Sequence, residues 1–251
     1  MRLLGIALLG CFMLTRPAVA QSERPWGFTS FYTYEALDGR RPAWHLLHLG
    51  VQHYFSPQLT LMAEVAMHQR FNRRDAALAL EGWATLWYGA YGNVRLQYVP
   101  HARFLPRVEG YVELYQGIGA WELAISFRPR FFTGETVPTL GLAMARYEGN
   151  WYLRTRMLLT ALAGHVNWTQ SFRARYYWNP PLAYVDLQFG YGRGVEIVDV
   201  GPVLRAVRTY FAAVRLQRFI TRTVGLSIGF SYSDDDLFIR RGISMGLFQR
   251  W

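Results

Sequence analysis

The residues best suited to chemistry in this sequence are arginines that recur two positions apart. Arg154 and Arg156 form one such pair, and Arg173 and Arg175 form another. In an extended strand, residues two positions apart lie on the same face, so each pair should point in one direction. Rows of guanidinium groups bind anions such as carboxylates and phosphates, or form ion pairs with acids on a neighbouring strand.

The same spacing predicts a larger charged face. It holds four carboxylates and about ten arginines, namely Glu64, Glu109, Glu113, Glu122, Arg95, Arg107, Arg128, Arg130, Arg154, Arg156, Arg173, Arg175, Arg205 and Arg215. One interpretation is an arginine-lined passage that attracts an anionic solute or an acidic polysaccharide. The other, which we favour for most of these residues, is ion pairing that stiffens a wall. The surplus of arginine is the part that pairing does not require.

Other candidate sites are weaker. Asp234, Asp235 and Asp236 could bind Ca²⁺ or perform acid–base chemistry, but successive residues in a tight turn do not converge on one point. The histidines at positions 45, 48, 53, 68, 101 and 165 do not share a face as a zinc site requires, and no nucleophile motif accompanies them. We therefore predict no catalytic residue, no metal site and no cofactor.

The charged face requires strands, and apolar and polar residues alternate along most of the chain. In 59–70, Leu61, Val65 and Met67 alternate with Glu64 and His68. Alternation of this kind is typical of half-exposed β-strands. We predict about fourteen strands, with twelve possible if 75–100 is divided differently, at 26–36, 42–54, 58–70, 75–87, 93–100, 105–117, 120–132, 136–147, 151–160, 165–178, 182–192, 204–218, 222–233 and 237–251.

The composition favours a membrane barrel over a soluble β-sandwich. Aromatic residues make up 16% of the chain and hydrophobic residues 51%. No stretch after the first 20 residues has the roughly 20 apolar residues that a membrane helix needs. We expect the tryptophans near the strand ends to form an interfacial girdle, namely Trp44, Trp83, Trp87, Trp121, Trp151, Trp168 and Trp178. The predicted fold is all-β, a single antiparallel transmembrane barrel of the outer-membrane type.

The connections between the predicted strands alternate in length, as they do in bacterial barrels. Short turns such as Ser56-Pro57 and Ile220-Thr221 are expected on the periplasmic side. The longest connection, 193–203, is expected outside. We expect no outside loop to fold deeply into the pore, because none is long enough.

The start of the chain has the features of a secretory signal peptide. Leu3–Leu14 is apolar, and Ala18 and Ala20 form an A-x-A cleavage site. We therefore predict a cleaved signal peptide at 1–20, a short leader at 21–25 and a barrel domain at 26–251. A lipoprotein signal ending at Cys11 is the alternative. All 27 basic residues are arginine and the net charge is +10; because of the export signal, nucleic acid is not expected as a partner.

The last predicted strand carries a further motif. Outer-membrane barrels end in a strand whose polar residue, glycine and final aromatic are recognised by the assembly machinery, and Ser244, Gly246 and Trp251 fit this pattern. Gln249 occupies a position where an aromatic residue is usual. By alternation, Phe248 should face inward, and Gln249 should face lipid.

Several blocks resemble one family. "RFLPRVEGYVELYQGIGAWELAISFR", "YEGNWYLRTRMLL", "SFRARYYW" with "YVDLQFGYGRG", and "RRGISMGLFQRW" are similar to the YaiO family of outer-membrane β-barrels. The resemblance covers nearly the whole chain after residue 20. It implies localisation in the outer membrane of a Gram-negative cell envelope and a barrel architecture, and it implies little about activity.

We expect a passive pore or export conduit with a net-positive lumen that serves anionic solutes or polysaccharide. The alternative is a structural or accessory envelope barrel that acts through partners. A lipid-modifying barrel enzyme is the third and weakest hypothesis. The expected partners are outer-membrane lipid and the outer-membrane assembly machinery.

Overall fold

The computed structural model describes residues 25–39, 41–180, 183–197 and 204–251. This part of the chain forms fourteen strands. Their bounds are β1 (Trp26–Leu37), β2 (Trp44–Ser56), β3 (Leu59–Arg70), β4 (Arg73–Trp87), β5 (Ala90–Tyr98), β6 (Val108–Ile118), β7 (Trp121–Phe132), β8 (Glu135–Glu148), β9 (Trp151–Leu162), β10 (His165–Asn179), β11 (Ala183–Ile197), β12 (Leu204–Phe219), β13 (Val224–Asp235) and β14 (Ile239–Arg250).

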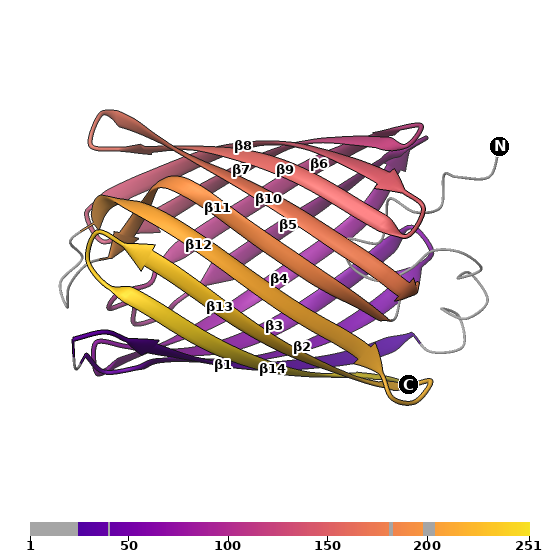
Figure 1. The fold of residues 1–251 in the computed structure, drawn as a ribbon, viewed down its shortest axis with the longest axis horizontal. Helices are drawn as coiled ribbons and strands as arrows, with labels where there is room; N and C mark the ends of the chain where they lie inside the picture. Colours follow the sequence, from indigo (N-terminus) through magenta and orange to yellow (C-terminus); the bar gives the residue numbers. More distant parts are fainter. Residues whose placement is uncertain (1–24, 40, 181–182, 198–203) are drawn as a thin grey trace.

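The strands close into one barrel. Each pairs antiparallel with the next along the chain, and β1 pairs with β14 from Gly27 opposite Arg250 to Leu37 opposite Arg240. The strands slant across the long axis of the barrel (Figure 1), as closure of a sheet requires. The prediction of an all-β barrel with fourteen strands is confirmed, and the alternative of twelve is wrong.

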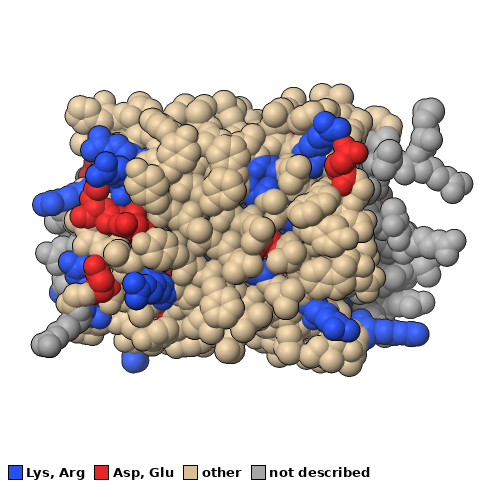
Figure 2. All heavy atoms as spheres, viewed as in Figure 1, with Lys and Arg blue, Asp and Glu red and all other residues tan. Residues whose placement is uncertain are grey.

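The alternation of side chains follows the prediction. On β3, Leu61, Val65 and Met67 are exposed on the outside, whereas Glu64 and Ala66 between them are buried in the interior. Successive residues of a strand point to opposite faces, so one strand supplies both surfaces. On the face seen in Figure 2, most charged residues gather toward the two ends and uncharged residues dominate the middle.

Large aromatic side chains lie at the rims of the outer surface. Trp26, Trp121, Trp151 and Trp251 are exposed at the end of the barrel where β1 begins and β14 finishes. Two members of the predicted girdle are elsewhere. Trp44 is buried and faces inward, and so does the partly buried Trp83, because both have the parity of the interior face.

The two ends of the barrel differ in their connections. The periplasmic end, as we call it, is where β1 begins and β14 finishes, because short turns lie on that side in bacterial barrels. The outer end carries 38–43, 99–107 and 236–238. It also has one turn that is shorter than predicted. Phe71 and Asn72, with φ of 51° and 58°, form a two-residue turn, so β4 begins at Arg73.

Outer connections fold inward, contrary to the expectation from their length. Val99 and Phe104 of the 99–107 connection are buried inside the outer end. Val195, near the end of β11, is buried against Val137 and Leu162. The predicted 193–203 connection is partly strand, since β11 runs to Ile197, and 198–203 lie outside the described residues. The prediction overlooked that the nine residues 99–107 are enough to fold back on the wall, where Val99, Phe104 and Leu105 supply the apolar contacts.

The predicted signal peptide at 1–20, with Ala18 and Ala20, lies outside the described residues, as does most of the 21–25 leader. The described part of the chain contains no helix that is both long and apolar enough to cross a membrane.

The two faces of β13 provide a test of which side chains contact lipid and which face the lumen. Phe230 is exposed on the outside, and Ser231 beside it faces the interior. We expect Phe230→Arg to lower the free energy of unfolding by about 2–4 kcal/mol, since it exposes a charge to hydrocarbon. Ser231→Arg should cost much less, because its side chain extends into the lumen. Urea unfolding in phospholipid vesicles measures both; equal losses would contradict the assigned faces.

Candidate functional site

The interior of the barrel holds an extended network of arginines and carboxylates. Alternation on β3–β7 and β9–β12 brings inward-facing charges from neighbouring strands together, as the sequence predicted for each strand separately. Three carboxylate clusters organise the network. They are centred on Glu64 with Glu109, on Glu113, and on Asp186.

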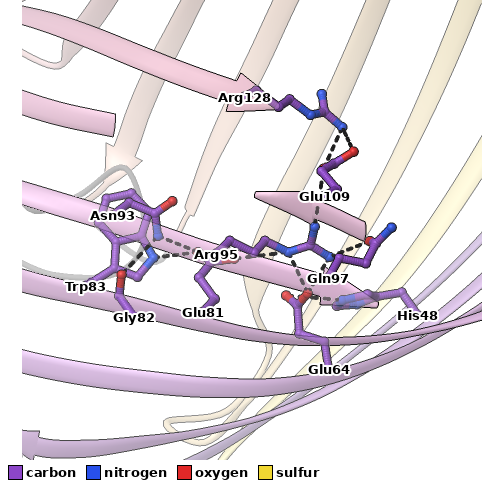
Figure 3. Close-up of polar contacts among 10 residues, drawn as sticks. All are labelled: His48, Glu64, Glu81, Gly82, Trp83, Asn93, Arg95, Gln97, Glu109 and Arg128. Atoms are coloured by element: carbon purple, nitrogen blue, oxygen red, sulfur yellow. Dashed lines mark hydrogen bonds and ion pairs between the residues drawn. The ribbon is translucent and has the colours of Figure 1, made fainter. Parts of the chain in front are cut away.

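Arg95 on β5 is the hub of the first cluster (Figure 3). Its Nη2 donates to Oε2 of Glu64 at 2.7 Å, and it forms longer ion pairs of 3.7 Å with both Glu81 and Glu109. Arg128 on β7 approaches Glu109 at 2.9 Å. One guanidinium group therefore links carboxylates from β3, β4 and β6, and it holds these strands in register from the inside.

Further polar side chains complete this cluster. Nε2 of His48 lies 3.3 Å from Glu64, and Arg95 donates to the amide oxygen of Gln97 at 3.1 Å. Glu81 accepts from the indole of Trp83 at 2.6 Å and from Asn93 at 3.0 Å. Each carboxylate thus has several donors, which a buried charge needs in order to be stable.

The second and third clusters lie on β6 and on β9–β11. Glu113 accepts from Arg154 at 2.7 Å, lies 3.6 Å from Arg156, and also accepts from the hydroxyls of Tyr111 and Tyr115. Asp186 on β11 accepts from Arg173 at 2.5 Å and from Arg175 at 2.7 Å.

A cluster of tyrosines surrounds Glu122 toward the periplasmic end. The hydroxyls of Tyr91, Tyr147 and Tyr152 donate to its carboxylate at 2.9, 3.1 and 3.4 Å. Glu122 is only 2% exposed, and Tyr91 stacks on Tyr115 at 4.3 Å. These side chains fill the part of the interior that lies against β5–β9.

The paired charges differ in their exposure to the lumen. The carboxylates of Glu109, Glu113 and Asp186 have side chains that are 4–6% exposed. Their partners Arg128 and Arg173 are 46% and 32% exposed. Short acids lie against the wall, and longer arginines extend over them. In these two pairs the guanidinium group is therefore the more exposed partner, whereas Arg154 and Arg175 are largely buried.

The opposite wall, formed by β12–β14 and β1, carries small side chains. Its inward positions include Ala213, Gly229, Ser231, Gly242 and Ser244. A Cβ at Gly229 would lie 2.6 Å from Oγ of Ser244, so glycine permits the close packing of these neighbours. Larger side chains also face inward on this wall, because Phe31 packs against Phe248 at 5.1 Å and Arg215 lies over the Phe31 ring. The small residues therefore cover only part of it.

The remaining predicted residues are placed as follows. Arg215 faces inward on β12, where its guanidinium lies 5.8 Å from the ring of Phe31 and pairs with no carboxylate of the described residues. Arg130 faces inward on β7, and Arg205 is exposed near the start of β12. Arg107 lies outside the strands, in the 99–107 connection.

The motif of the last strand is placed on β14 and just after it. Ser244 and Gly246 face the interior, whereas Gln249 is exposed on the outside. Trp251, which follows β14, is exposed and exchanges two backbone hydrogen bonds of 3.2 Å with Trp26.

The count of interior carboxylates predicted from the sequence was too low. Asp75, Glu81, Asp186 and Asp235 also face inward and are buried or partly buried, so the positive surplus is smaller than the predicted four against ten. Parity could have found Asp75, Glu81 and Asp186, which lie within predicted strands. Glu81, for example, shares its face with Ala79 and Trp83. The division of 75–100 into strands was the uncertain step.

The other candidate clusters do not converge. Asp235 pairs with Arg240 at 3.1 Å inside the barrel, while Asp236 accepts from the backbone N–H of Arg208 at 3.0 Å outside it. That backbone bond, followed by the Arg208 guanidinium, holds the pKa of Asp236 below its usual value. Among the residues described, no three His, Cys, Asp or Glu side chains are grouped so that they could hold a metal ion.

A lipid-modifying hydrolase would need its catalytic side chains on the lipid-facing surface of the barrel. His45 on this surface hydrogen-bonds the hydroxyl of Tyr32 at 2.8 Å, and His53 packs against Trp26 and Phe55. Within the described residues, the contacts of these two histidines are thus aromatic.

Comparison with known proteins agrees with the geometry. The family model of the YaiO membrane β-barrel domain matches residues 27–195. The chain belongs to the YaiO family of membrane β-barrels. The resemblance seen in the sequence is thereby confirmed, and this YaiO barrel is an outer-membrane protein with a channel-like fold. The sequence matches none of the curated proteins with which it was compared.

Solved structures share the fold. Omp33 from Acinetobacter baumannii is similar with a TM-score of 0.54 and 11% identity, covering 90% of this chain and 99% of that one. An outer membrane channel from Pseudomonas putida F1 has a TM-score of 0.54 and 10% identity, with 91% and 96% covered. OmpF from Salmonella typhi has a TM-score of 0.52 and 6% identity, with 91% and 97% covered.

The Arg95 hub yields a stability prediction. Arg95→Met keeps most of the side-chain volume but leaves the buried carboxylates of Glu64 and Glu109 with fewer partners. We expect a loss of about 3–5 kcal/mol in the free energy of unfolding, as for other broken buried ion pairs. The control is Arg146→Met, which removes an exposed pair with Glu148 and should cost at most about 1 kcal/mol. Equal unfolding midpoints for the two variants in urea would refute the hub role.

Proposed function

We propose that this YaiO barrel is a passive channel whose lumen favours anions. The observation that carries the proposal is the unequal exposure of the paired charges, with Arg128 46% and Glu109 6% exposed. A solute in the lumen would meet guanidinium groups first and the carboxylates only through them. Arginine stays charged at every physiological pH and offers a planar fork to carboxylate and phosphate groups.

The proposed path follows the wall of small residues on β12–β14 and β1. Arg215 on β12 belongs to this wall, and Arg173 on β10 extends in its direction to pair with Asp186 on β11. Since Arg215 is paired with no described carboxylate, it adds uncompensated positive charge. A path with small polar groups on one side and guanidinium on the other suits hydrated anionic solutes, including acidic sugars.

A second candidate function is a non-conducting envelope barrel that acts through partners. The inward-folded connections at the outer end favour it, because Val99, Phe104 and Val195 bury apolar surface there. Planar-bilayer recording separates the two functions. A steady current supports the channel, and a silent, correctly folded protein supports the accessory role.

Ion selectivity tests the role of the exposed arginines. In a salt gradient, the wild-type protein should pass anions in preference to cations. Removing one charge at about 4 Å in water changes the energy of an ion by ~1 kcal/mol, or roughly fivefold in local concentration. Arg128→Gln with Arg215→Gln should therefore lower the anion preference severalfold, measured as a shift of reversal potential. Arg146→Gln, on the outer surface, is the control and should change nothing.

The path itself can be blocked. Ser231→Trp places a large ring on the wall of small residues, and we expect it to reduce conductance strongly while ion selectivity is retained. The matched control is Phe230→Trp, which changes the lipid-facing side of the same strand. If the two variants conduct equally well, the path does not run along this wall.

We also propose that β14 is the segment recognised by the outer-membrane assembly machinery. The support is the pattern Ser244, Gly246 and Trp251, of which Trp251 is exposed. Trp251→Ala should lower the folded fraction in outer-membrane extracts, seen as less heat-modifiable protein on gels, whereas Trp178→Ala at the same rim should not. A normal folded fraction for Trp251→Ala argues against this role.

A further inference from the structure

The connection between β5 and β6 is held inside the barrel by a single carboxylate. Asp75 on β4 is 3% exposed and faces the interior. It accepts from the backbone N–H groups of Arg103 at 3.1 Å, Phe104 at 3.0 Å and Leu105 at 2.8 Å. Three consecutive N–H groups converge on one side chain, an arrangement that binds a negative charge strongly.

Apolar contacts fasten the same segment. Val99 is fully buried and packs with Ala66 and Ala77 of the inner wall, and Leu105 packs against this cluster. Phe104 is 3% exposed. At the base of the segment, the backbone N–H of Val99 donates to the carbonyl of Arg107 at 2.9 Å. The segment is therefore a packed part of the interior.

The position of this segment bears on the width of the passage. Fourteen strands spaced by about 4.8 Å and tilted by about 40° enclose a backbone cylinder roughly 28 Å across. A packed layer of chain occupies about 10 Å of that width. The 99–107 segment lies over the inner faces of β3 and β4, so it covers one side of the opening at the outer end. Phe238, packed against Trp44, lies on another side, and the two together narrow the opening.

We propose that residues 99–107 are the size filter of the channel, and that Asp75 is the residue that positions them. The proposal rests on the channel function above and specifies what limits its solutes. Asp75 does not touch the solute. It acts by fixing the backbone of the segment, so that the remaining opening has a constant width.

The test uses full-length protein in liposomes that swell as neutral sugars of increasing size enter. Neutral sugars separate size selection from charge selection. Asp75→Asn keeps the shape of the side chain but replaces one acceptor oxygen by an N–H₂ group that faces backbone donors. We expect the rate for a trisaccharide, relative to a monosaccharide, to rise severalfold. Phe104→Ala weakens the apolar contacts of the same segment and should shift this ratio in the same direction.

Trypsin gives a second readout that a general loss of stability would not produce. Arg103 and Arg107 are cleavage sites within the segment, and Asp75→Asn should speed cleavage there while cleavage elsewhere is unchanged. The control is Asp38→Asn, which removes an exposed carboxylate at the same end that pairs with Arg41. It should alter neither the sugar ratio nor the cleavage.

The outcomes are distinct. A wild-type protein that passes no sugar and no ions contradicts the channel and the filter together. A conducting protein whose sugar ratio is unchanged in both Asp75→Asn and Phe104→Ala overturns the filter and leaves the channel intact. Faster cleavage without a changed ratio also overturns it, because the segment would then be released without widening the opening.

Discussion

The hydrogen-bond ladder between β1 and β14 is the contact on which the rest of the structure depends. Inside a bilayer no water can satisfy a free strand edge, so a sheet must close on itself. The ladder runs from the pair Gly27 and Arg250 to the pair Leu37 and Arg240, and it joins the first strand to the last. It also creates an enclosed interior, and every inward-facing side chain must then find its partner there.

Closure explains how the interior charges are arranged. Carboxylates brought out of water need several donors, and Glu64, Glu113 and Asp186 obtain arginine donors from β5, β9 and β10 respectively. Because an arginine side chain is longer than that of an acid, its stem crosses over the carboxylate and its head remains nearer the water. Ion pairing for stability is therefore compatible with the proposed cationic lumen, although the sequence had suggested the two as alternatives.

The strand pattern could be predicted almost completely, and parts of the site could not. Alternation gave the faces of Arg154, Arg156, Arg173 and Arg175 because face is a local property of an extended chain. The prediction of an aromatic girdle, in contrast, was wrong for Trp44 and Trp83. Their parity pointed inward, and both face the interior. The carboxylates Asp75 and Glu81 lay within the predicted strand 75–87 at the inward parity, but they were not assigned to the charged face.

The sequence by itself determined the class of fold, the number of strands and the direction in which most charged side chains point. Each of these follows from a repeat of two residues along one strand. Only the tertiary structure decided which charges pair, where small residues from neighbouring strands come together, and that 99–107 folds inward onto Asp75. The contacts of Asp75, for example, join residues that are 28–30 positions apart. Such contacts depend on strand register and barrel curvature, which no local pattern of residues specifies.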